Sequence, residues 1–210
     1  MVVDARETLQ FLPRSPSMTG IIFVCGSGVS AHAYVPLLRP IADSGYPVFI
    51  VRLPFRFAPF ESHRLVAIDR VRQVVEEHKE TSRWVLSGHS LGGALACRVA
   101  TKHRDLLSAL VLVGTTHPKH DNLSSLGFPV TKVYASNDGV APSEKVRAYQ
   151  HLLPADTKWV LIDGGNHSQF GHYGHQLLDG TSTISRNAQQ QITRTAILES
   201  ITTVERSTDR

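Results

Sequence analysis

Short apolar runs alternate along the chain with longer segments in which apolar residues recur at helical spacing. The apolar runs are four to six residues long, which is typical of strands buried on both faces of a parallel sheet. They lie at residues 8–12, 21–25, 47–52, 84–87, 109–113, 130–135 and 158–163. The predicted helices lie at residues 33–44, 65–78, from 90 onwards, 143–152 and 185–204.

This alternation predicts an α/β fold, with a mainly parallel sheet and helices on both of its faces. The length of 210 residues suits a single domain that spans residues 1–210. We expect the first strand, which ends at Pro13, at an edge of the sheet, and we expect the Ser/Thr-rich end after Val204 to fray. Ligands of such sheets bind at the carboxyl ends of the strands, so the residues after each strand are the candidates for chemistry.

A G-x-S-x-G run from Gly88 to Gly92 joins the predicted strand at 84–87 to a helix that begins with small residues. A serine on a sharp turn between a strand and a helix forms a nucleophile elbow, which exposes the hydroxyl at the edge of the sheet. The five-residue pattern alone also fits a plain turn. The strand before it and the small-residue helix after it favour Ser90 as a nucleophile.

A serine hydroxyl needs a base to take its proton and a third group to orient that base. Asp138 follows the strand at 130–135, and His167 follows the strand at 158–163. Both residues should therefore lie on the sheet edge that carries Ser90. The order serine, acid, histidine is that of nucleophile-elbow hydrolases, so we predict Ser90, Asp138 and His167 as the catalytic residues.

Two alternatives remain open for these residues. Asp138 could be a turn or capping residue and Asp163 the acid, although Asp163 ends the same strand that presents His167. His167, His172 and His175 could form a metal site, although no Cys or Glu accompanies them at ligand spacing. We predict no metal and no cofactor, because the triad chemistry needs neither.

Acyl transfer also needs backbone N–H donors for the oxyanion that forms at the substrate carbonyl. The amide of Leu91, directly after the nucleophile, is one candidate. The loop at residues 26–30 has the sequence G-S-G-V-S and should supply the other, with Ser27 favoured and Gly28 next. This loop does not fit a nucleotide-phosphate motif, because the third glycine and the following lysine are missing.

From about Thr8 to Ile201 the chain resembles the compact α/β hydrolases near the dienelactone-hydrolase-like group. The resemblance rests on residues 21–34, 46–54, 88–93, 132–141 and 164–174, the last with an N-H-x-Q-F-G run. It implies the α/β-hydrolase fold and hydrolysis of a carboxylic ester or related acyl bond. Dienelactone hydrolases use a cysteine nucleophile, so Ser90 argues against that activity. A nucleophilic serine in place of an aspartate also excludes dehalogenase and epoxide-hydrolase chemistry.

Many lipases and dehalogenases of that fold insert a cap where this chain has only residues 115–129. A segment of this length is too short for a helical cap, so we expect an open site and a small or short-chain acyl substrate. Phe55, Phe57 and Phe60 follow the strand at 47–52 and could wall an acyl pocket, or two of the three could belong to the core. Tyr34 and His117 are expected at the mouth of the site.

Charge and composition change this picture little. The net charge is +4, and the 22 basic residues are scattered without a dense basic run, so no nucleic acid is expected as a partner. No apolar run approaches the ~20 residues of a membrane span, and residues 1–10 lack the apolar core of a signal peptide. We therefore expect a cytoplasmic location and no membrane contact. Cys25 and Cys97 should be buried reduced thiols, and Cys25 stands where many α/β hydrolases carry histidine.

The sequence thus predicts a serine carboxylesterase whose partner is a small-molecule acyl ester. A thioesterase or peptidase with the same triad is the first alternative. A non-catalytic binding module that keeps the fold is the second, and the presence of all three triad residues argues against it.

Overall fold

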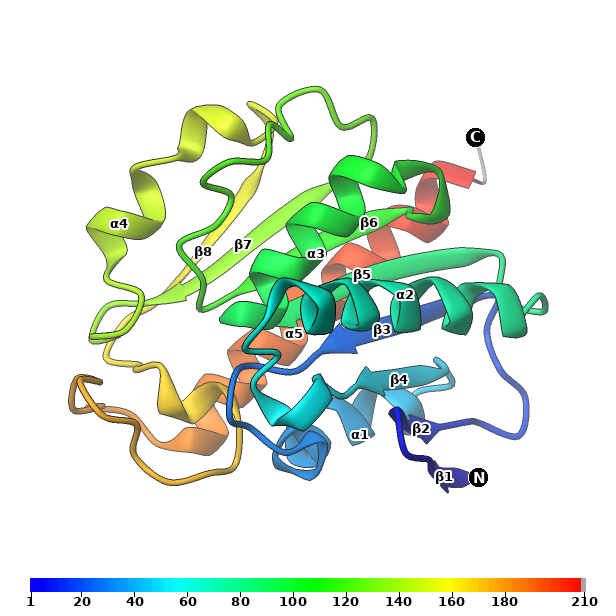
Figure 1. Cartoon of the computed structure of the whole chain (residues 1–210), viewed down its shortest axis with the longest axis horizontal. Coiled ribbons are helices and arrows are strands. Elements are labelled where there is room, and N and C mark those ends of the chain that lie inside the picture. The colour runs from blue at the N-terminus through cyan, green and yellow to red at the C-terminus, as the bar shows by residue number, and fades with distance from the viewer. Residues whose placement is uncertain (209–210) are drawn as a thin grey trace.

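The seven apolar runs and one additional short strand form an eight-stranded sheet in the order β1-β2-β4-β3-β5-β6-β7-β8 (Figure 1). The computed structural model describes residues 1–208. The strands are β1 (Val2–Asp4), β2 (Thr8–Phe11), β3 (Thr19–Val24), β4 (Val48–Val51), β5 (Arg83–His89), β6 (Ala109–Val113), β7 (Val130–Ala135) and β8 (Lys158–Ile162). The α-helices are α1 (Val35–Asp43), α2 (Glu61–Glu77), α3 (Leu91–Lys102), α4 (Ser143–Arg147) and α5 (Arg186–Thr208). Short 3-10 helices are η1 (Ala31–Tyr34), η2 (Pro54–Arg56), η3 (Arg104–Leu106), η4 (Gln150–Leu152) and η5 (Ser168–Phe170).

The strands from β4 across the sheet to β8 are parallel, as the alternation of strands and helices predicts. Helices α2 and α3 pack together over one face of the sheet, and α1 and α5 pack together over the opposite face (Figure 1). Because both faces are covered, every residue of β3 and β6 is buried. The α/β prediction with helices on both faces is confirmed.

The N-terminal edge of the sheet differs from the prediction. Residues 8–12 were expected at the edge, but β1 pairs antiparallel with β2 and lies outside it, with Val2 opposite Phe11. A tight turn joins the two strands, with the Ala5 amide donating to the Thr8 carbonyl over 2.9 Å. Strand β1 has only three residues and two of them are exposed, so its hydrophobic pattern was too short to reveal it.

Helix boundaries also shift. The predicted helix 33–44 begins as the 3-10 turn η1, and α1 starts at Val35 with a proline in its first turn. The predicted helix 143–152 breaks after Arg147, because Tyr149 leaves helical backbone angles before η4. The expected fraying after Val204 is wrong as far as the structure describes the chain, since α5 continues to Thr208; residues 209–210 lie outside the described part.

The segment that could have carried a cap contains no helix or strand between β6 and β7. Within residues 1–208, no helix combines the length and the apolar character that crossing a membrane requires. Cys25 and Cys97 are buried free thiols, and burial raises the pKa of each to about 12, so neither is a nucleophile at neutral pH.

Candidate active site

Ser90 occupies the turn between β5 and α3 with backbone angles φ 54° and ψ −117°. A residue other than glycine rarely adopts a positive φ, so the backbone of this turn is strained. Two glycines make it possible. A Cβ on Gly88 would lie 2.3 Å from the Gly92 carbonyl oxygen, and a Cβ on Gly92 would lie 2.1 Å from the Val24 carbonyl oxygen. The turn between β5 and α3 therefore requires glycine at both positions of the G-x-S-x-G pattern, because a side chain at either one would collide with backbone atoms.

The loops after β7 and β8 bring Asp138 and His167 together. Nδ1 of His167 lies 2.8 Å from Oδ2 of Asp138, and both side chains are buried. The other carboxylate oxygen of Asp138 accepts hydrogen bonds from the amides of Val140 at 2.9 Å and Ala141 at 2.6 Å. These two amides fix the carboxylate, so its free oxygen can only face the imidazole.

Asp163, the alternative acid, makes a different contact. Its carboxylate accepts a hydrogen bond from the Ser136 hydroxyl at 3.0 Å, and that hydroxyl also accepts one from the Gly164 amide. Asp163 therefore holds the turn after β8, whereas Asp138 is the carboxylate that faces His167.

Ser90 and His167 line one cavity of about 170 Å³ at the carboxyl edge of the sheet. Nε2 of His167 is buried and has no hydrogen-bond partner among residues 1–208. With Nδ1 bonded to Asp138, Nε2 is the nitrogen left to act as a base. The rest of the wall is Leu91, Ala94, Gly114, Thr115, Thr116, His117, Val140 and Ala141.

Asp179 is a half-buried carboxylate that the sequence analysis did not single out. Its Oδ1 accepts from the amides of Gly139 at 3.3 Å and His167 at 3.0 Å, and its Oδ2 accepts from the amide and hydroxyl of Ser168 at 2.8 and 2.6 Å. Burial raises its pKa, but these hydrogen bonds outweigh burial and hold the pKa of Asp179 below its ordinary value. The Asp179 carboxylate thus connects the turn that carries Asp138 to the turn that carries His167.

No local pattern marks Asp179, because it lies in an irregular segment between η5 and α5. The close approach of this segment to the Asp138 turn is visible in its backbone. A Cβ on Gly180 would lie 2.0 Å from the Asn137 carbonyl oxygen, and a Cβ on Gly139 would lie 2.2 Å from the Leu178 carbonyl oxygen. The two glycines were the only sequence signal that could have pointed to this contact.

Tyr34 does not line the mouth of the site, contrary to expectation. Its side chain is fully buried, because its hydroxyl accepts from the Gly26 amide at 2.9 Å and lies 2.9 Å from Nδ1 of His89. The His89 ring in turn contacts the His167 ring at a centroid distance of 4.5 Å. Burial, and then the nearby His167, lower the pKa of His89 well below its ordinary value, so His89 is neutral.

These contacts make Tyr34 a support rather than a substrate contact. The Tyr34 hydroxyl, which accepts from the Gly26 amide, thus joins that amide to Nδ1 of His89 through a second hydrogen bond. The network links the loop after β3 to His89 at the end of β5 and, through the contact of the two rings, to His167.

The two candidate oxyanion amides after β3 differ. The Gly28 amide donates to the Arg56 carbonyl at 2.8 Å, so it is already used and the Gly28 expectation is not supported. The Ser27 amide has no acceptor among the described residues, and Ser27 is exposed. The Leu91 amide is in the first turn of α3, where helical N–H groups have no acceptor within the helix. Ser27 and Leu91 therefore keep free donors.

The three phenylalanines after β4 are all exposed, by 77% for Phe55, 56% for Phe57 and 67% for Phe60. The alternative that two of them belong to the core is wrong. Phe57 lies against Gly28, where a Cβ would be 3.1 Å from its ring, and Phe55 lines a neighbouring cavity instead of the one at Ser90.

His117 is the one member of the predicted substrate set that lines the Ser90 cavity within the described chain. Burial and the cations Lys119 and Lys132 lower its pKa to about 4, so it is neutral at pH 7. Lys132 is buried in β7 and donates to the His117 carbonyl. Burial lowers the pKa of Lys132 to about 8.

A metal site formed by His167, His172 and His175 is not present in this geometry. His172 and His175 are exposed, whereas His167 is buried against Asp138. Among residues 1–208, no three His, Cys, Asp or Glu side chains come together in an arrangement that could hold a metal ion.

Comparison with curated proteins yields partial matches. Cutinase 1 of Thermobifida cellulosilytica is 29% identical over 103 residues, which cover 48% of this chain and 38% of that protein. A cutinase of Thermobifida fusca is 29% identical over 103 residues, covering 48% of this chain and 34% of that protein. The match thus spans little more than a third of the length of these relatives.

Solved structures match over nearly the whole chain. Est1E from Butyrivibrio proteoclasticus has a TM-score of 0.69 at 14% identity and covers 96% of this chain and 98% of its own. The monoacylglycerol lipase of Paleococcus ferrophilus has a TM-score of 0.70 at 14% identity and covers 94% of this chain and 99% of its own. At such low identity these likenesses show the fold alone.

The family model described as "Alpha/beta hydrolase family" matches residues 20–191. That range runs from β3 through the first turns of α5 and contains the elbow, the Asp138 turn and the His167 turn. The chain belongs to the alpha/beta hydrolase family.

Proposed function

We propose that this protein is a serine hydrolase that cleaves a carboxylic ester of a small substrate through an acyl-enzyme intermediate on Ser90. The observation that carries the proposal is the state of His167. Its Nδ1 is bonded to the buried Asp138, its Nε2 has no partner among the described residues, and the residue lines the same cavity as Ser90. A histidine held in this way is prepared to accept a proton.

In the proposed reaction the Ser90 hydroxyl attacks the ester carbonyl while Nε2 of His167 takes its proton. Asp138 stabilises the imidazolium without taking a proton itself. The amides of Leu91 and Ser27 donate to the oxyanion of the tetrahedral intermediate. The alcohol leaves with the proton from His167, and a water activated by the same nitrogen then hydrolyses the acyl-serine.

The form of the cavity supports a small substrate. Its volume is about 170 Å³, and the segment between β6 and β7 places no helix over it. The similar proteins include a cutinase and a monoacylglycerol lipase, and hydrolysis of an ester by this chain is compatible with both.

The test is covalent labelling together with turnover. A fluorophosphonate probe should label the wild-type protein on Ser90, and Ser90→Ala should lose both the label and the turnover of para-nitrophenyl acetate by at least ~10³-fold. Ser87→Ala, a change of the buried serine three residues earlier in β5, should keep the label on Ser90. A wild-type protein that takes no label and turns over no ester is a non-catalytic member of the family, and the proposal then fails.

A profile of acyl chain length, measured on matched esters and thioesters, then decides between an esterase and a thioesterase. We expect esters with short acyl chains to give the highest kcat/KM, because the cavity at Ser90 is small. A preference for thioesters at every chain length would contradict the ester assignment.

A further inference from the structure

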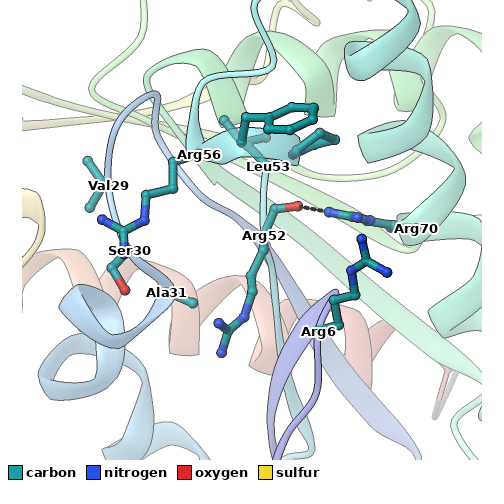
Figure 2. Close-up of a pocket in the computed structure, with 10 residues that line it drawn as sticks. Arg6, Val29, Ser30, Ala31, Arg52, Leu53, Arg56 and Arg70 are labelled. Carbon is teal, nitrogen blue, oxygen red and sulfur yellow. Dashed lines mark hydrogen bonds between the residues drawn. The ribbon is translucent and has the colours of Figure 1, made fainter.

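A second cavity lies beside the catalytic edge, and four arginines line it. Its volume is about 360 Å³, and it lies between the loop after β3 and the loop after β4 (Figure 2). The arginines come from separate parts of the chain: Arg6 from the turn between β1 and β2, Arg52 and Arg56 from the loop after β4, and Arg70 from α2.

The positive charge of this cavity exceeds the negative charge around it. Arg52 pairs with Asp4, and Arg70 lies 3.2 Å from Glu7. Both carboxylates are about half exposed, and Asp4 also lies 3.0 Å from His32. Arg6 and Arg56 have no carboxylate partner within residues 1–208.

Donors are also in excess over acceptors. The buried Nε atoms of Arg52 and Arg70 have no hydrogen-bond partner in the part of the chain that the structure describes. One guanidinium nitrogen of Arg70 donates to the Arg52 carbonyl at 2.7 Å, which holds the Arg70 side chain against the cavity wall (Figure 2). A cavity with surplus fixed cations and unused N–H donors is suited to an anion.

The loop that presents Arg56 is strained. Phe55 has φ 53°, Arg56 has φ 64° and Ala58 has φ 43°, and none of them is a glycine. The loop is held by bonds at its base, where the Ala58 amide donates to the Pro54 carbonyl at 2.9 Å and the Gly28 amide donates to the Arg56 carbonyl at 2.8 Å. Strain of this kind is retained where the geometry it creates is useful.

That geometry joins the cavity to the proposed oxyanion site. The Arg56 carbonyl is bonded to Gly28, the residue directly after Ser27. The Arg56 side chain extends to the Ser30 side of the cavity (Figure 2). Phe55, 77% exposed, adds an apolar wall to the same cavity. A ligand here would lie beside the loop that receives the ester carbonyl.

We propose that this arginine cavity is a subsite for the acidic group of an ester substrate, a carboxylate or a phosphate carried at the end opposite the scissile bond. Guanidinium groups stay charged at all physiological pH values and bind either anion through paired N–H donors. The proposal rests on the ester hydrolysis proposed above, and it makes the enzyme selective for acidic esters over neutral ones.

The test compares para-nitrophenyl hydrogen suberate with para-nitrophenyl octanoate, which differ only in a terminal carboxylate, at low ionic strength. The ratio of their kcat/KM values should favour the acidic ester in the wild type, and Arg6→Gln/Arg56→Gln should lower that ratio about tenfold, mainly through KM. Lys79→Gln/Arg104→Gln removes the same charge from two exposed positions outside the cavity and should leave the ratio unchanged. An equal fall in both double variants, or in neither, would overturn the subsite.

A second measurement needs no turnover. Sodium phosphate should raise the thermal unfolding midpoint of the wild type above its value in sodium chloride of equal ionic strength, because an anion that binds the folded state stabilises it. The rise should disappear in Arg6→Gln/Arg56→Gln and persist in Lys79→Gln/Arg104→Gln. If neither ester is turned over and the phosphate effect remains, the proposed esterase activity fails while the anion cavity stands.

Two outcomes would overturn the substrate assignment. One is a phosphate effect without any preference for the acidic ester, which would make the cavity a site for a free anion. The other is sedimentation with vesicles of phosphatidylcholine and phosphatidylserine that depends on Arg6 and Arg56, without a phosphate effect, which would make this face a lipid-binding surface.

Discussion

On one side of Ser90, the loops after β7 and β8 hold Asp138 and His167 in buried, hydrogen-bonded contacts. On the other side, the loop after β4 exposes Phe55 and Arg56 to solvent in a strained backbone. The buried side contains the groups that carry the proposed chemistry. The exposed side contains the side chains of Phe55 and Arg56, which are accessible to a ligand from solvent.

The proposed catalytic groups and the proposed substrate contacts therefore lie in separate loops that differ in their freedom to vary. The buried side has little freedom, since both carboxylate oxygens of Asp138 have partners and a lost partner would leave an unsatisfied charge. The side chains of the exposed loop touch little of the core, so substitutions there should change substrate preference at small cost in stability.

Asp138→Asn should produce the largest effect. The amide group would favour the wrong tautomer of His167, so kcat for para-nitrophenyl acetate should fall by ~10³–10⁴-fold with little change in fold. Asp163→Asn is the matched control, because Asp163 bonds to Ser136 instead of His167, and it should keep nearly wild-type kcat. The reverse result would move the acid from Asp138 to Asp163.

Lys132→Met should reveal a charge on the buried side that has no carboxylate partner among residues 1–208. The lysine has a pKa of 10.5 when unfolded and about 8 when folded. Between these values the unfolded state binds more protons, so this lysine makes the free energy of unfolding rise as pH rises from about 8 to about 10.5, and its contribution is lost as pH falls through 8. The difference corresponds to about 3 kcal/mol.

The measurement is urea unfolding of wild type and variant at pH 7 and pH 10. The wild type should gain roughly 2–3 kcal/mol relative to Lys132→Met on going to pH 10. Lys79→Met removes an exposed lysine and should run parallel to the wild type at both pH values. A constant difference between wild type and Lys132→Met would show that Lys132 keeps its ordinary pKa.

Asp179→Asn should loosen the buried side without removing any group that touches substrate. The neutral amide binds the Ser168, His167 and Gly139 donors more weakly, so kcat should fall about tenfold while KM changes little. Asp179→Glu should recover less than full activity, since its longer side chain displaces the two turns. Asp105→Asn, a change in η3, is the control. A rise in KM with unchanged kcat would contradict a positioning role.

Phe55→Ala should have the smallest effect, and it tests the exposed side. The ring is 77% exposed, so the free energy of unfolding should change by no more than about 0.5 kcal/mol. The kcat/KM for para-nitrophenyl octanoate should fall a few-fold, because the apolar wall beside the arginine cavity is lost. A destabilised variant would show that Phe55 serves the fold after all.

Much of the fold followed from local pattern. The runs at 109–113 and 130–135 coincide with β6 and β7, because strands buried on both faces carry a mainly apolar signal, which in β7 is interrupted by Thr131 and Lys132. Strand β1 and the break after Arg147 carried no such signal, because β1 has only three residues and the break is a local change in the backbone angles of Tyr149. The same limit applied to Tyr34, whose burial depends on the position of His89, 55 residues later in the chain.

By itself the sequence determined the α/β class, the elbow around Ser90 and the chain order in which an acid and a histidine follow later strands. These properties depend on residue spacing within single segments. Such spacing can be recognised directly from local backbone preferences and from the period of the hydrophobic residues. Only the tertiary structure decided that Asp138 and not Asp163 faces His167, that Asp179 joins their two turns, that the Gly28 amide is already used, and that arginines from three segments line one cavity. Each of these depends on hydrogen bonds or charges between residues far apart in the chain, and no pattern within one segment encodes them.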